Sequence, residues 1–124
     1  VAFGDNLDAL IQPLKMGKAF TLGAMGSKEA NFYNDAYSRS GWSVASSVVQ
    51  DLWLQGRREE AAKAVPDEMV FQTNLLGTET MIKDRLAAYQ KSGVTTLKVA
   101  PVAGNLEEKI KMLGRIIDLA KSLS

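Results

Sequence analysis

Apolar positions in the first half of the chain recur with the period of a helix. Between Leu7 and Leu14 they lie three or four residues apart, and Pro13 interrupts this stretch. A proline inside a helix loses one hydrogen bond and clashes with the preceding turn. The pattern therefore predicts two short helices, or one kinked helix, that meet at Pro13.

Three further helices are predicted before residue 66. The first covers residues 27–40, with Ser27 as its cap and Gly41 at its end. The second covers residues 42–55, and its broad apolar stripe predicts a well-buried helix. That stripe consists of Val44, Ala45, Val48, Val49, Leu52 and Trp53. A short alanine-rich helix over residues 57–65 follows, and Pro66 ends it.

The pattern changes after Pro66, where strands are expected to alternate with helices. Residues 70–76 and 94–100 are the two predicted strands, the latter rich in β-branched side chains. Thr78 should cap a helix over residues 79–92, with Gly93 at its end. Its apolar face consists of Ile82, Leu86 and Tyr89, and the chain closes with a helix that begins at Asn105. We expect that last helix to turn inward the residues Leu106, Ile110, Leu113, Ile117 and Ala120.

The stretch "GVTTLKVAPVAGNLEEKI", residues 93–110, has the order strand, loop, helix that α/β barrels repeat. Such a barrel needs about 250 residues, and this chain has 124. The chain is therefore expected to form a single partial domain over 1–124. It would consist of a helical region over 1–65 and two terminal strand–helix units over 66–124.

Composition and charge narrow the functional classes. The net charge is +1, and basic residues are interspersed with acidic ones, so nucleic acid is not an expected partner. No apolar run reaches the roughly 18 residues of a membrane span, and no signal-peptide pattern is present. We expect a cytoplasmic protein without a membrane partner.

Two absent residue types limit the chemistry. Without cysteine or histidine, the chain has no thiolate nucleophile, no imidazole base and none of the commonest metal ligands. We therefore expect no metal site. Catalysis within these residues would depend on Asp, Glu, Lys, Tyr or backbone groups. "LGAMGS" lacks the G-x-G-x-x-G spacing and a preceding strand, so it does not predict a dinucleotide site.

Several stretches, in this order, resemble the C-terminal portion of the luciferase-like oxidoreductases that use a flavin or coenzyme F420. They are "LGAMGSKEANFYND", "QDLWLQGRREEAAKAVPDEMV", "NLLGT" and "AAYQKSGVTTLKV". The resemblance implies an α/β, predominantly helical fold: the last part of a (β/α)8 barrel with a helical insertion and two parallel strands. It also implies hydride transfer between F420 or FMN and an organic substrate.

The resemblance assigns no catalytic or cofactor-binding residue to this chain, because the family's cofactor contacts come mostly from earlier strands. It leaves the substrate side of the pocket as the site to which these residues would contribute. The candidates are Gly26, Asn31, Asn34, Gly77, Thr78 and Lys98. Each also has a purely structural interpretation: a turn or close packing for the glycines, a helix start for the asparagines, and a solvated edge for Lys98.

A second interpretation of the chain is non-enzymatic. Two strands cannot close a barrel, and open strand edges favour association. The chain would then be a helical assembly or interaction module. Its partner would be the remaining barrel segment or a second copy, which would make it an oligomer.

Overall fold

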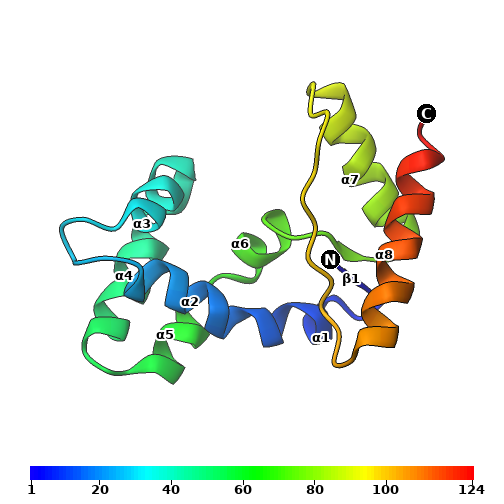
Figure 1. Ribbon diagram of the computed structural model, residues 1–124. Coiled ribbons are helices and arrows are strands. Elements are labelled where there is room, and N and C mark those ends of the chain that lie inside the picture. Colours follow the sequence, from blue (N-terminus) through cyan, green and yellow to red (C-terminus); the bar gives the residue numbers. More distant parts are fainter. The chain divides into compact units, whose positions relative to one another are not determined.

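The chain forms two units in the computed structural model, which describes residues 1–124 (Figure 1). The strand unit consists of residues 1–10 and 74–124, and the helical unit consists of residues 11–73. The chain passes from the first to the second within helix α1 (Leu7–Ile11). This division differs from the expected boundary at residue 66, because the first ten residues supply a strand to the C-terminal part of the chain.

The sheet of the strand unit has two short parallel strands, β1 (Ala2–Phe3) and β2 (Leu76–Gly77). Ala2 is opposite Leu76, and Phe3 is opposite Gly77. The amide of Ala2 donates to the carbonyl of Leu75 at 3.0 Å, and the amide of Gly4 donates to the carbonyl of Gly77 at 2.9 Å. Two parallel strands are therefore present, as predicted, but they pair different residues from those expected.

The predicted strand over residues 70–76 is wrong in most of its length. Residues Asp67–Gln72 form helix α6, and only Leu76–Gly77 belongs to a strand. Pro66 has extended backbone angles that suit a helix entry, and Asp67 and Glu68 place negative charge at the positive end of the helix dipole. These start signals outweigh the β propensity of the apolar residues that follow.

The predicted strand over residues 94–100 is also not formed, because the segment lacks a continuous partner. Its ends are held by hydrogen bonds. The Val94 amide donates to the Tyr89 carbonyl at 3.1 Å. Val1 donates through its nitrogen to Ala100 at 2.6 Å and accepts from the Val102 amide at 2.9 Å. The spacing of these last two bonds is that of a parallel pair.

Helices α7 (Glu79–Lys91) and α8 (Leu106–Lys121) complete the strand unit. The predicted cap by Thr78 is confirmed, since its Oγ1 accepts from the Met81 amide at 3.3 Å. The last helix begins after Asn105, as predicted, and Asn105 Oδ1 caps it by accepting from the Glu108 amide at 2.9 Å. The buried core of the unit consists of Val1, Leu75, Ile82, Leu86 and Ile116. Ile82 and Leu86 confirm the predicted inner face of α7.

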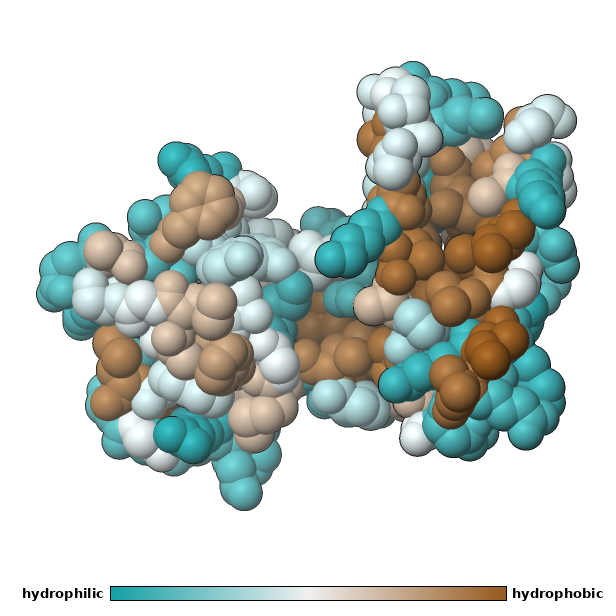
Figure 2. Space-filling view, viewed as in Figure 1, coloured by the Kyte–Doolittle hydropathy of each residue, from teal (hydrophilic) through white to brown (hydrophobic).

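The predicted inner face of α8 is wrong. Ile116 is the buried residue of this helix, with Met112 and Leu119 partly buried beside it. Leu106 is 72% exposed and Ile110 is 59% exposed. The helix carries two adjacent apolar stripes. It packs against the core with the stripe of Met112, Ile116 and Leu119, which lies next to the predicted one. Figure 2 shows hydrophobic residues gathered on the surface of this unit.

The helical unit contains six consecutive helical elements besides α6. They are η1 (Gln12–Leu14), α2 (Lys15–Ala24), α3 (Phe32–Tyr37), η2 (Ser38–Trp42), α4 (Ser43–Leu54) and α5 (Arg58–Ala64). The predicted break at Pro13 is confirmed, because this residue lies in the 3-10 turn η1 between α1 and α2. Helices α2, α4 and α5 pack against one another.

Two details of this unit differ from the sequence predictions. Asn31, not Ser27, caps α3: its Oδ1 accepts from the Asn34 amide at 3.0 Å. Helix α4 is buried along only part of the predicted stripe: Val49 is fully buried, but Val44 is 78% exposed, and Ser46, outside the stripe, is fully buried. The helix is rotated so that its close-packed side meets α2, where Trp53 lies against Gly23.

Candidate functional site

The candidate site with the clearest geometry lies where the two parallel strands end. β2 ends at Gly77, and Thr78 directly caps helix α7. The hydrogen bond from the Gly4 amide to the Gly77 carbonyl places the end of β1 beside it. Ligands of α/β proteins bind outside the carboxyl ends of parallel strands, on the loops that follow them. Two of the six residues predicted from the sequence, Gly77 and Thr78, therefore lie together at a suitable position.

Gly77 is required by its backbone conformation. Its φ angle is +127°, a region that other residues rarely adopt. A Cβ atom added here would lie 2.8 Å from Met81 Sδ. The glycine thus allows the strand to turn sharply into α7, and its buried backbone lies against the Met81 side chain.

An ion pair that the sequence analysis did not predict lies next to this turn. Arg115 donates through Nε and Nη2 to Glu79 Oε1, at 3.0 and 2.9 Å. Its guanidinium carbon is 3.9 Å from the ring centroid of Phe3, so a cation–π contact supports the pair from the end of β1. Because Arg115 lies 36 residues after Glu79, no local pattern indicates this contact. Both side chains are about half exposed, and the pair can present hydrogen-bonding groups to a polar ligand.

Lys98 lies in the same unit but in the irregular 94–99 segment, and it is exposed to solvent. Val99, next to it, packs against the core. Its position agrees with the structural interpretation of this residue, in which Lys98 lies at a solvated edge.

The other three predicted residues belong to the helical unit. Asn31 and Asn34 are buried, and their side-chain amides each donate to the Leu22 carbonyl at 3.0 Å. Asn34 also donates to the Ser46 carbonyl at 2.9 Å. Their polar atoms therefore connect the end of α2 to α3 and α4. The Leu22 carbonyl lies in the last turn of α2, where carbonyls have no partner within the helix, and the two amides supply one.

Gly26 has a comparable structural explanation. Its φ angle is +144°, and an added Cβ atom would lie 2.2 Å from the carbonyl oxygen of Ala30. The group that approaches Gly26 closely is therefore the Ala30 carbonyl of the chain itself, and not a ligand.

Other kinds of site are not indicated. No three His, Cys, Asp or Glu side chains are grouped so that they could hold a metal ion. None of the helices combines the length and the apolar character needed to cross a membrane.

Comparison with known proteins identifies relatives of the chain. The sequence pattern of the luciferase-like monooxygenases matches residues 1–96. The Mycobacterium tuberculosis protein Rv3520c, an inferred coenzyme F420-dependent oxidoreductase, is 32% identical over 108 residues. That alignment covers 87% of this chain but only 30% of the relative. No solved structure matches the chain significantly.

Proposed function

Since the chain belongs to the luciferase-like monooxygenase family, we propose that it is the C-terminal part of an oxidoreductase of the F420- or FMN-dependent kind. The complete protein would transfer hydride between the cofactor and an organic substrate. The observation that carries this proposal is the parallel pairing of β1 with β2, followed directly by helix α7. A parallel strand followed by a helix is the repeating unit of a (β/α)8 barrel.

The strand-end residues do not fit a flavin or deazaflavin cofactor by themselves. Such a cofactor needs donors for its phosphate and a wall for its ring system. Thr78 Oγ1 already accepts from the Met81 amide, and the Glu79 carboxylate would repel a phosphate at the start of α7. Arg115 is already paired with Glu79. We infer that the cofactor is held mainly by residues outside this chain.

The contribution of this chain would be to the substrate side of the pocket. Thr78 is exposed at the strand end, and the Arg115–Glu79 pair offers a polar group with no net charge. A charge-neutral pair orients a polar group of a substrate and gives little attraction to a bare anion. The substrate expected is a small organic molecule.

A chimeric protein tests this proposal. The segment of Rv3520c that aligns with this chain would be replaced by the chain, and binding of F420 and of FMN would be followed by quenching of cofactor fluorescence. Unmodified Rv3520c and the isolated 124-residue chain are the two controls. We expect the chimera to bind the same cofactor as its parent, and the isolated chain to bind neither.

Two results would contradict the proposal. A folded chimera that binds neither cofactor, while Rv3520c binds one, would show that the chain cannot complete the barrel. An isolated chain that binds F420 or FMN as tightly as the chimera would show that the cofactor site lies within these residues.

The assembly module remains as a second candidate because of α8. Leu106, Ile110 and Ile117 form an apolar stripe on this helix that nothing within the chain covers. Exposed apolar stripes of this kind mark interaction surfaces. In this interpretation the chain associates with a second copy or a separate barrel segment, and light scattering should show an oligomer. A stable monomer would count against it.

A further inference from the structure

The helical unit is one continuous stretch, residues 11–73, that lies between the two paired strands in the sequence. Side chains near its two ends are bonded to each other. Gln12 donates to the Asp67 carboxylate at 3.3 Å, and Lys15 forms an ion pair with the same carboxylate at 2.5 Å. A segment whose ends are held close together can be inserted into another domain and still keep a fold of its own.

This unit also has a well-buried apolar interior. Its helices α2, α4 and α5 pack against one another, and seven of its apolar residues are at most 1% exposed. These residues are Ala19, Leu22, Val49, Ala61, Val65, Met69 and Val70. Domains of about 60 residues do fold alone, although their margin of stability is small. The buried interior therefore meets the main requirement for independent folding.

Polar contacts fix the arrangement of these helices. Asn34 donates to the carbonyls of Leu22 and Ser46, which joins α3 to α2 and α4. Lys18 on α2 donates to the Tyr37 hydroxyl on α3 at 2.6 Å, and its ammonium lies 4.7 Å from the centre of the Tyr37 ring. Buried hydrogen bonds with satisfied partners specify one packing of the surrounding helices.

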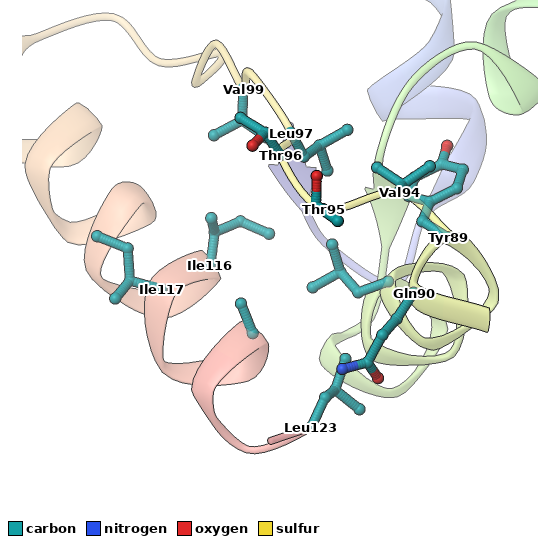
Figure 3. Close-up of a pocket in the computed structure, with 12 residues that line it drawn as sticks. Tyr89, Gln90, Val94, Thr95, Thr96, Leu97, Val99, Ile116, Ile117 and Leu123 are labelled. Carbon is teal, nitrogen blue, oxygen red and sulfur yellow. The ribbon is translucent and has the colours of Figure 1, made fainter. Parts of the chain in front are cut away.

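The core of the strand unit is less well covered. Four of its five core residues are between 6% and 9% exposed, and an open groove of about 330 Å³ runs beside Leu86 and Ile116. Figure 3 shows Ile116 on one side of this groove and the segment from Val94 to Val99 on another. Because hydrophobic stabilisation increases with the apolar area that is removed from water, this core contributes less than a closed one.

We propose that the helical unit is an independent folding module, which stays folded when the strand unit opens. Most chains of under about 150 residues unfold in one cooperative transition, and this chain would have two. Parts of a protein open at different free energies where their buried contacts differ. An opened strand unit would expose its strand edges for association, while residues 11–73 keep their shape. The inference concerns these two units alone and holds whether or not the proposed function is correct.

Hydrogen exchange of the full 124-residue chain, followed by NMR at several low urea concentrations, is the direct test. We expect the most protected amides of α2 and α4 to exchange at least about tenfold more slowly than those of α7 and α8. The two groups should also respond differently to urea, because they would open in separate events.

Two variants perturb the units one at a time. Leu86→Ala removes buried contacts from the strand unit, and Leu22→Ala does so in the helical unit. Each should lower protection in its own unit by about thirtyfold or more and change protection in the other by less than about threefold. Leu106→Ala makes the same change at a position of α8 that is 72% exposed, and it should leave both units within about threefold of the native chain.

The test remains decisive if Leu86→Ala unfolds the strand unit completely. The protection of α2 and α4 should then persist, and the urea midpoint detected by Trp42 and Trp53 should equal that of the native chain. A loss of protection that is equal in both units would show a single cooperative domain and overturn the proposal. Exchange of the α2 and α4 amides as fast as in an unfolded chain would also overturn it.

Discussion

Replacing Asn34 by aspartate exchanges one nitrogen atom for oxygen at a buried position, with little change in shape. In the native chain the side-chain nitrogen donates to two carbonyl oxygens, those of Leu22 and Ser46, at 3.0 and 2.9 Å. An aspartate oxygen at that place would face two acceptors instead. Leu22 would keep the hydrogen bond from Asn31, whereas Ser46 would lose its side-chain partner.

The expected loss of stability has two parts. Two lost donor bonds, at roughly 1 kcal/mol each, give about 2 kcal/mol. Ionisation adds to this, because burial and the two carbonyl oxygens favour the protonated acid and raise the pKa of the new carboxyl in the folded state. Each pKa unit corresponds to about 1.4 kcal/mol. The loss of stability from ionisation is absent at pH values below the unfolded-state pKa of about 3.9. It grows with pH until the pH exceeds the folded-state pKa.

Urea unfolding followed by tryptophan fluorescence measures this effect selectively, because Trp42 and Trp53 both lie in the helical unit. Asn34→Asp should lower the free energy of unfolding by about 1–2 kcal/mol at pH 4.5, where the protonated acid can still donate one hydrogen bond. At pH 7.5 the loss should be about 4 kcal/mol. Asn31→Asp should cost less, since it keeps the oxygen that caps α3 and loses one donor.

The neighbouring change Asp35→Asn serves as the control. Asp35 is exposed on the same helix, and its replacement should change stability by no more than about 0.5 kcal/mol. The reasoning fails if Asn34→Asp costs no more than this control at pH 7.5. It also fails if the cost is the same at the two pH values, because the carboxyl would then be solvated.

Two further predictions concern the helical unit. In Gly23→Ala the added Cβ atom would lie 2.4 Å from Trp53 Cβ; the clash should outweigh the better helix propensity of alanine, lower stability by about 1–2 kcal/mol and shift the tryptophan emission. An unchanged spectrum and urea midpoint would refute this. The hydrogen bond from Lys15, at 2.5 Å, and its positive charge lower the pKa of the Asp67 carboxyl. The ion pair therefore stabilises the fold at pH values above the ordinary aspartate pKa. This stabilisation is lost as the pH falls through the lower pKa that Asp67 has in the folded state. The urea midpoint of Asp67→Asn should accordingly change less between pH 7 and pH 3 than that of the native chain, and an equal change would refute the assignment.

Features that depend on neighbours within one helical turn could be predicted from the sequence. The cap by Thr78 uses an amide three residues later, and the cap by Asn105 does the same. The interruption at Pro13 follows from the proline ring itself. Gly93 takes a φ angle of +87° at the end of α7, which glycine adopts without strain. Each of these signals is local and is unaffected by the rest of the fold.

Features that depend on distant partners could not be predicted. β2 pairs with residues 2 and 3, more than seventy positions earlier, and no pattern in residues 70–76 indicates that partner. The orientation of α8 also depends on distant partners. The helix has two adjacent apolar stripes, and contacts with Leu75 and Ile82 select the stripe that contains Ile116.

The candidate site shows the same division. Gly77 and Thr78 were predicted because the sequence signals for a strand end and a helix start are adjacent there. Arg115 was missed because its partners, Glu79 and Phe3, are distant in sequence. Asn31 was a candidate substrate contact with a helix start as its structural interpretation. Its polar atoms bond to backbone groups of its own unit, one of them as the cap of α3. Amino-acid type alone does not distinguish these roles.

The strand unit leaves two kinds of surface without a partner, and together they bear on the two candidate functions. The apolar stripe of α8 with Leu106 and Ile110 would suit either a second copy or the rest of a barrel. The backbone of residues 95–98 is different, because its N–H and C=O groups make no hydrogen bond to another strand. A helical assembly module has no need of such a segment, since it would bury side chains and leave these groups to water. A barrel does need it, because each strand is bonded along both edges. The β-branched composition of this segment is therefore better explained by the proposed barrel part than by a purely helical partner.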